Sequence, residues 1–178
     1  MDHPLSYFLF CPHCGSKKFE EHDFKSKLCA ACGFTYYANI AAAAACFIRN
    51  GKGELLIVRR KSDPAKGTLD LPGGFADMGE NGEEAISREI SEETGLQVPP
   101  PRYLFSLPNI YLYSGMEIHT LDLFFEATVT DCGRLTASDD VSELSFLPLN
   151  EIDPALFGLN SIQKAVKKYL FLSLSKEK

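Results

Sequence analysis

The sequence predicts an α/β domain preceded by a small cysteine-rich unit. Three observations carry this prediction. Two Cys-x-x-Cys pairs lie within the first 32 residues, strand-like apolar runs begin at residue 41, and the segments 82–94 and 160–174 have helical spacing. Because strands and helices follow one another along the chain after the cysteines, we expect helices packed on a sheet. The predicted division is residues 1–37 and residues 38–178.

Length and charge narrow the class of protein. The chain has 178 residues, 45% of them hydrophobic, which suits one domain with a small appendage. Its net charge of -6 argues against nonspecific binding to nucleic acid or anionic membranes, because such binding needs Lys and Arg. The first ten residues are interrupted by Asp2, His3 and Pro4, and no apolar run of membrane-spanning length follows. We expect a cytoplasmic protein.

Four of the six cysteines form two pairs, each followed by glycine: Cys11-Pro-His-Cys14-Gly15 and Cys29-Ala-Ala-Cys32-Gly33. Two such turns supply the four thiolates of a structural zinc site and resemble a zinc ribbon. The alternatives are two disulfides, which the expected cytoplasmic setting disfavours, or a redox pair, which the duplication disfavours. His13 and His22 are interpreted as surface residues, and Cys46 and Cys132 stand apart.

The chain becomes apolar after a boundary near residues 36–39. The run from Ala41 to Ile48 is alanine-rich, yet the turn Asn50-Gly51-Lys52-Gly53 and the strand-like run 55–58 follow it, which favours a hairpin over a helix. Leu71-Pro72-Gly73-Gly74 then punctuates the chain, and its glycines predict a close approach to the backbone.

The segment 82–94 has the signals of a capped helix. Asn81 is the predicted N-cap, Glu84 reaches back to it, and Gly95 ends the helix. The spacing i, i+3, i+4 gathers three carboxylates on one face, those of Glu89, Glu92 and Glu93. Their mutual repulsion near a negative helix end calls for a cation, and oxygen ligands favour Mg²⁺ or Mn²⁺. An exposed acidic stripe is the alternative.

The fixed positions from Gly74 through Glu80 and Arg88-Glu89-Ile90-Ser91-Glu92-Glu93 to Leu96 resemble the Nudix box without departure. The resemblance implies the Nudix fold, a mixed sheet between helices in an α/β/α sandwich. It also implies that Glu89, Glu92 and Glu93 hold the catalytic cations, with the carbonyl of Gly73 as a further ligand. Arg88 and Glu80 are expected to form a supporting ion pair. The candidate substrate-binding residues are Gly74, Phe75 and Tyr111.

The implied reaction is cleavage of the pyrophosphate bond of a nucleoside diphosphate linked to another group, in a dinucleotide, ADP-ribose-like or NTP-like substrate. The general base is a box glutamate, Glu89 or Glu92, or an acid of a later loop that contains Asp139, Asp140 and Glu143. A solvated turn is the alternative interpretation of that loop. A further hypothesis is a nucleotide-sensing regulator whose zinc ribbon contacts a partner, but the intact box acids favour catalysis.

The substrate is less well defined. A zinc ribbon before a Nudix domain resembles the NADH pyrophosphatases, yet their Ser-Gln-Pro-Trp-Pro-Phe-Pro segment is absent and the chain has no tryptophan. The aromatic residues at 103, 105, 111 and 113 are interpreted as core or dimer contacts or as a stacking surface. The run 121–130 predicts a buried strand, and 160–174 predicts a helix with a solvated lysine face. The sequence leaves the oligomeric state open, with a homodimer as the candidate assembly.

Overall fold

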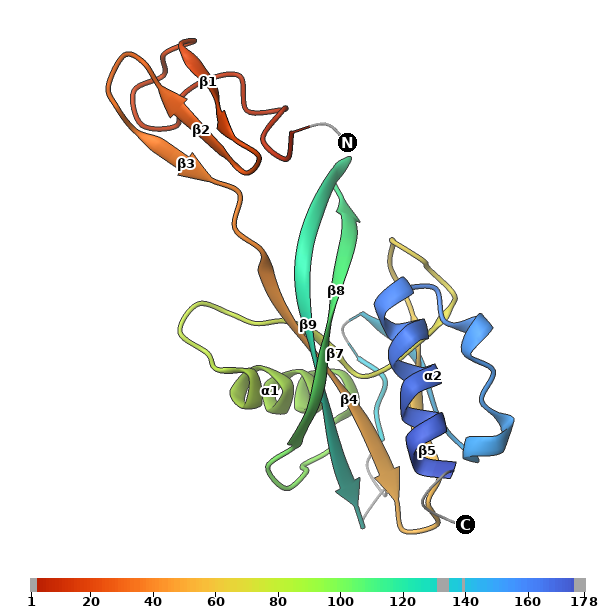
Figure 1. Ribbon diagram of the computed structural model, residues 1–178. Coiled ribbons are helices and arrows are strands. Elements are labelled where there is room, and N and C mark those ends of the chain that lie inside the picture. The colour runs from red at the N-terminus through yellow and green to blue at the C-terminus, as the bar shows by residue number, and fades with distance from the viewer. Residues whose placement is uncertain (1–2, 131–134, 139, 175–178) are drawn as a thin grey trace. The chain divides into compact units, whose positions relative to one another are not determined.

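The computed structural model describes residues 3–130, 135–138 and 140–174 (Figure 1). Its contacts divide the chain into two compact units, Met1–Ile40 and Ala41–Lys178. Cys132 and Asp139, which the sequence singled out, lie outside the described residues.

The first unit is a three-stranded antiparallel sheet with the order β1-β2-β3. The strands are β1 (Phe19–Asp23), β2 (Ser26–Cys29) and β3 (Thr35–Tyr37). Its core is small, because only Cys11, Phe19 and Cys29 form its buried apolar cluster. A core of this size needs additional stabilisation, such as a structural metal.

The second unit is built on a seven-stranded sheet whose main path is β10-β5-β4-β9-β8. The pairing of β4 with β9 is parallel and the other pairings are antiparallel, so the sheet is mixed, as the resemblance implies. The strands are β4 (Ala41–Asn50), β5 (Leu55–Arg60), β6 (Leu69–Asp70), β7 (Gly73–Phe75), β8 (Arg102–Tyr113), β9 (Met116–Val129) and β10 (Val141–Leu147).

Two α-helices cover opposite faces of this sheet, α1 (Gly82–Thr94) and α2 (Asn160–Leu174) (Figure 1). Alternation along β4 produces the two faces, because successive side chains of a strand point in opposite directions. Phe47 lies in the core cluster of α2 and stacks on Tyr169 with ring centroids 4.0 Å apart. Ile48 lies in the cluster that contains Ile86 of α1. The predicted sandwich is therefore confirmed. Two 3₁₀ turns, η1 (Leu149–Glu151) and η2 (Pro154–Leu156), precede α2.

Helix α1 begins and ends where the sequence predicts. The side chain of Asn81 accepts a hydrogen bond from the amide of Glu84, whose carboxylate accepts one from the amide of Asn81. Gly95 ends the helix with φ of 70°. Because these signals are local, the sequence was sufficient to place both ends.

The predicted hairpin of β4 and β5 forms, but its strands diverge beyond a single registered pair, Arg49 with Leu55. The segment 69–75 occupies the opening, where β6 pairs with β5 and β7 pairs with β4. The amide of Cys46 donates to the carbonyl of Pro72 at 2.9 Å, which continues the β4 side of this contact. The hairpin prediction therefore missed an insertion that becomes one edge of the candidate site.

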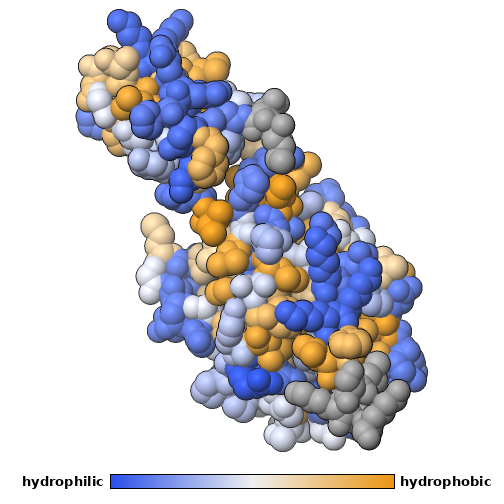
Figure 2. All heavy atoms as spheres, viewed as in Figure 1, coloured by the Kyte–Doolittle hydropathy of each residue, from blue (hydrophilic) through white to orange (hydrophobic). Residues whose placement is uncertain are grey.

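Helix α2 keeps its lysines in solvent, as expected. Lys164, Lys167 and Lys168 are exposed, whereas Ile162, Ala165 and Val166 are buried. Hydrophilic residues colour much of the surface over α2 in Figure 2. Among the described residues, no helix is both long and apolar enough to cross a membrane.

The close approach of Gly73 to β4 can be tested by substitution. A Cβ at this position would lie 2.1 Å from the carbonyl oxygen of Ala44, and Gly73 has φ of +150°. Gly79 also has a positive φ, +93°, but has nothing within 4 Å of its Cβ position, so Gly79→Ala is a matched control. We expect Gly79→Ala to cost about 1–2 kcal/mol, and Gly73→Ala about 1–3 kcal/mol more, in the free energy of unfolding. Urea denaturation followed by circular dichroism measures both, and equal losses would contradict the close-contact argument.

Candidate functional site

A cavity of about 330 Å³ opens in the second unit, beside β7 and α1. Its lining includes residues of β7 and α1 and residues of β8 and β9. Most residues that the sequence predicted for the site line this cavity, namely Gly73, Gly74, Phe75, Arg88, Glu89, Glu93, Tyr111 and Asp140. The structure therefore brings the Nudix box together with residues distant from it in sequence.

The backbone of β7 lies directly against two glutamates of α1. The amide of Gly73 donates to Oε2 of Glu93 at 2.9 Å. A Cβ at Gly74 would lie 2.5 Å from Oε1 of Glu89, so the absence of a side chain there makes room for that carboxylate. Glu93 is 6% exposed and the side chain of Glu89 is 12% exposed, so both carboxylates are held at the cavity wall.

The Arg88 guanidinium joins the glutamates of the predicted box by hydrogen bonds. Its Nε and Nη2 donate to the two carboxylate oxygens of Glu80 at 2.8 and 2.9 Å, which is the predicted ion pair. Its Nη1 donates to Glu89 at 2.8 Å and to Glu92 at 3.1 Å. Its Nη2 also donates to the carbonyl of Phe75 at 3.1 Å. These five hydrogen bonds match the five donors of a guanidinium, so Arg88 acts as a positioning group and has no donor left for a substrate.

The hydrogen bonds that Arg88 donates also change the pKa of the Glu80 carboxyl group. Hydrogen bonds from Arg88 lower the pKa of Glu80 to about 2. Because the pKa in the folded state is depressed, the stabilisation by this pair is present above the ordinary pKa of a glutamate. It is lost progressively as the pH falls from that value through about 2. The pair therefore keeps its charge across the physiological pH range.

Glu92 is more exposed than the other two predicted cation ligands of α1, Glu89 and Glu93. Its side chain is 50% exposed, and it does not belong to the cavity lining. Its carboxylate is turned toward Arg88, one helical turn earlier on the surface of α1. The structure thus places two of the three predicted carboxylates at the cavity and the third beside it.

The acids of the later loop have separate environments. Asp140 lines the cavity and accepts a hydrogen bond from Oγ of Ser62 at 3.0 Å. Glu143 instead pairs with Arg59 at 2.8 Å, where both side chains are largely exposed. The preceding residues attach to the end of α1, where the amide of Ser138 donates to the carbonyl of Glu93. Asp140 is therefore the one of the two described acids that faces the cavity.

A polar group of the cavity lining, formed by Arg60, Asp70 and Tyr111, was not predicted from the sequence, which had indicated Tyr111 alone. Nη1 of Arg60 pairs with Oδ2 of Asp70 at 2.7 Å, and Nη2 contacts the hydroxyl of Tyr111 at 3.2 Å. Burial raises the pKa of Asp70, although the Arg60 guanidinium acts in the opposite direction. The aromatic ring of Tyr111 also meets Phe75 edge-to-face, with centroids 5.5 Å apart. These residues come from four strands, so no local sequence pattern joins them.

A second polar group centres on Asp122 of β9. Its two carboxylate oxygens accept hydrogen bonds from the hydroxyls of Thr120 and Ser161, each at 2.5 Å. Asp122 and Thr120 line the cavity. A charged residue within the apolar run 121–130 was the available signal, but no local pattern indicated its partner on α2.

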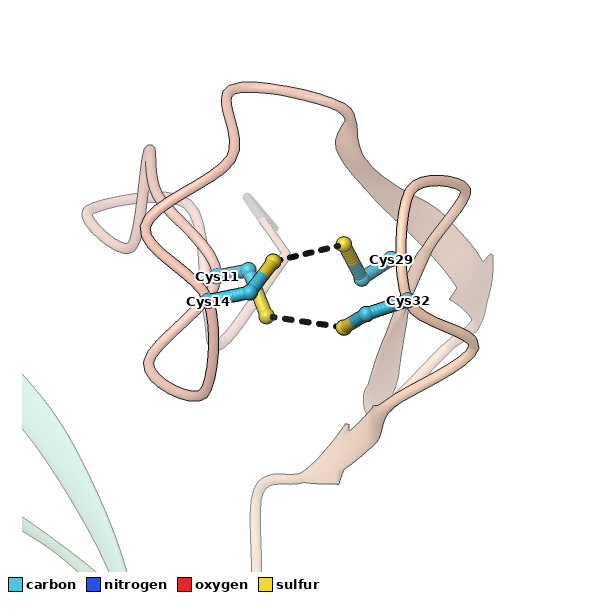
Figure 3. Close-up of side chains that lie close together, drawn as sticks. All are labelled: Cys11, Cys14, Cys29 and Cys32. Atoms are coloured by element: carbon cyan, nitrogen blue, oxygen red, sulfur yellow. Dashed lines mark hydrogen bonds between the residues drawn. The ribbon is translucent and has the colours of Figure 1, made fainter.

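The four cysteines of the first unit point toward one another (Figure 3). Their sulfur atoms all lie within 4.8 Å of one another, with Cys11–Cys32 at 3.8 Å and Cys14–Cys29 at 3.6 Å. A disulfide needs about 2.05 Å, whereas thiolates around a tetrahedral zinc are about 3.8 Å apart. All four cysteines are free, so the disulfide alternative is wrong and the cluster is consistent with a zinc ribbon. His13 and His22 lie outside it, and His13 stacks on Phe34.

Known proteins resemble this chain in sequence. The family described as NUDIX domain matches residues 39–170. An ADP-ribose pyrophosphatase of Methanocaldococcus jannaschii is 37% identical over 119 residues, which are 66% of each chain. An NAD-capped RNA hydrolase NudC of Haemophilus influenzae is 33% identical over 65% of this chain and 44% of its own length. The chain therefore matches about two thirds of the first relative and less than half of the second.

The fold comparison gives the same result. A NUDIX hydrolase from Nitrosomonas europaea superimposes with a TM-score of 0.70 at 20% identity, covering 90% of this chain and 89% of that one. Similarity at this identity concerns the fold, and the match to residues 39–170 includes the whole box with its glutamates and arginine. This chain is a member of the Nudix hydrolase family of enzymes.

Proposed function

We propose that the protein hydrolyses the pyrophosphate bond of a nucleoside diphosphate linked to a further group, of the ADP-ribose or dinucleotide type. The observation that carries this proposal is the convergence of Glu89 and Glu93 on one cavity wall beside the backbone of Gly73 and Gly74. The names of the two relatives, an ADP-ribose pyrophosphatase and an NAD-capped RNA hydrolase, support the same bond type.

The donor set fits a hard divalent cation. Carboxylate oxygens of Glu89, Glu92 and Glu93, with the carbonyl of Gly73, are ligands of the kind that Mg²⁺ or Mn²⁺ prefers. When bound, the cation would neutralise the diphosphate and acidify water. Arg88 contributes by holding Glu89 and Glu92 in place from one guanidinium. Phe75 and Tyr111 supply an aromatic edge that can contact a base, and Gly74 leaves room for the phosphates.

A carboxylate must also take the proton of the attacking water. A box glutamate, Glu89 or Glu92, is one candidate for this role. Asp140 is the other, because it lies in the same cavity lining as Glu89. Its attachment to Ser62 and the anchoring of its loop to α1 fix its position.

The box glutamates provide the first test. We expect Glu89→Gln, Glu92→Gln and Glu93→Gln each to lower kcat for ADP-ribose with Mg²⁺ by about 10²-fold or more, because cation binding is weakened. Glu83→Gln, an exposed residue of the same helix, is the control and should retain activity. The assay follows release of the mononucleotide product across a panel of ADP-ribose, NADH, diadenosine polyphosphates and nucleoside triphosphates. Tight nucleotide binding without turnover of any panel member would instead support the nucleotide-sensing alternative.

Asp140 has its own test. We expect Asp140→Asn to lower kcat by about 10²-fold, the usual size of a general-base contribution, with little change in thermal stability. Glu143→Gln is the matched control from the same loop, because its carboxylate pairs with Arg59 away from the cavity lining. Unchanged turnover in both variants would leave the box glutamates as the base.

We further propose that the four cysteines hold one structural Zn²⁺. The agreement of the sulfur distances with tetrahedral coordination supports this, and four protein ligands leave no open position for catalysis. Elemental analysis should find one zinc per chain in protein purified without chelator. Cys11→Ser or Cys29→Ser should lose it, whereas Cys46→Ala, a buried cysteine of β4, should keep it. Zinc-free wild-type protein would be evidence against the site.

A further inference from the structure

The lining that β8 and β9 contribute to the cavity includes Asn109, Thr120 and Asp122, which have no part in the reaction described above. Its polar members are Asn109, Tyr111, Thr120 and Asp122. Asp122 is 7% exposed and Thr120 is 4% exposed, so this wall is a built, buried surface and not a solvated edge.

Asp122 is fixed on both sides by short hydrogen bonds. Thr120 Oγ1 and Ser161 Oγ each donate to one of its oxygens at 2.5 Å. An ionised carboxylate offers about four lone-pair sites and can only accept. With one protein donor on each oxygen, Asp122 can still accept from a ligand in the cavity. The wall therefore favours a ligand group that donates hydrogen bonds.

The charged residues that line the cavity also favour a neutral donor group, and not an anion, at Asp122. Among its described lining residues are six carboxylates, those of Asp70, Asp77, Glu89, Glu93, Asp122 and Asp140, and two arginines. Both arginines are ion-paired, Arg60 with Asp70 and Arg88 with Glu80. A phosphate placed against Asp122 would meet a buried carboxylate, while the two arginines of the described lining are already paired with other carboxylates, which is unfavourable. A sugar hydroxyl at the same place would meet an acceptor.

We propose that Asp122 is a specificity-determining residue that accepts hydrogen bonds from the hydroxyls of a sugar attached to the diphosphate and disfavours a further phosphate in that position. The proposal rests on the proposed function and assigns its substrate class, a nucleoside diphosphate linked to a polyol in preference to a nucleoside triphosphate. Asp122 selects between these substrates because it attracts the sugar hydroxyls and repels a further phosphate.

The test compares two substrates in two proteins. We expect Asp122→Asn to lower kcat/KM for ADP-ribose by about 10- to 100-fold, the size of a lost hydrogen bond to a charged group, and to leave kcat/KM for ATP unchanged or raised. Glu117→Gln removes a charge from an exposed position of the same strand and should leave the ratio of the two values unchanged. An equal fall for both substrates in Asp122→Asn would overturn the proposal.

A measurement on the wild-type protein does not depend on how the variant folds. ADP esterified with a five-carbon alkyl alcohol keeps the diphosphate but lacks the sugar hydroxyls. We expect its kcat/KM to be about 10- to 100-fold below that of ADP-ribose in the wild type. Equal values for the two esters would overturn the role of Asp122, whereas no cleavage of either would overturn the proposed function itself.

Discussion

The contact between the backbone of Gly73 and that of Ala44 and Ala45 determines how the rest of the site is arranged. A Cβ on Gly73 would lie 2.1 Å from the oxygen of Ala44 and 2.7 Å from Cα of Ala45. Only a glycine opposite a strand of small residues permits this approach. As a consequence, the segment 69–75 enters the opening between β4 and β5 and brings Asp70 and the backbone of Gly73 and Gly74 to the cavity.

Arg88 then fixes α1 against this inserted segment. One guanidinium contacts Glu80 in the loop before the helix, the carbonyl of Phe75 on β7, and two glutamates of the helix itself. Three glutamates near the C-terminal end of a helix repel one another and the helix dipole. Arg88 offsets part of that repulsion, and the amide of Gly73 offsets another part at Glu93. The carboxylates are thereby positioned by the protein before any cation binds.

The sequence predicted those features whose cause is local. Asn81, Glu84 and Gly95 placed the ends of α1, and the spacing of Cys11, Cys14, Cys29 and Cys32 predicted their cluster. Features that join distant strands were not predicted. Arg60 and Tyr111 are 51 residues apart, and Asp122 and Ser161 are 39 residues apart. Their meeting depends on the order of strands in the sheet and on the insertion between β4 and β5, which no local pattern encodes.

Two acids of the cavity, Glu89 and Asp122, differ in what holds them. Glu89 is held by a cationic side chain and lies against a glycine, so its surroundings are open to a charged partner such as a divalent cation. Asp122 is held by two neutral hydroxyls on a buried wall, and a carboxylate surrounded by neutral donors remains an acceptor for further neutral donors. The proposed function and the proposed role of Asp122 use this difference, because the diphosphate with its cations is assigned to α1 and the neutral substituent to β9.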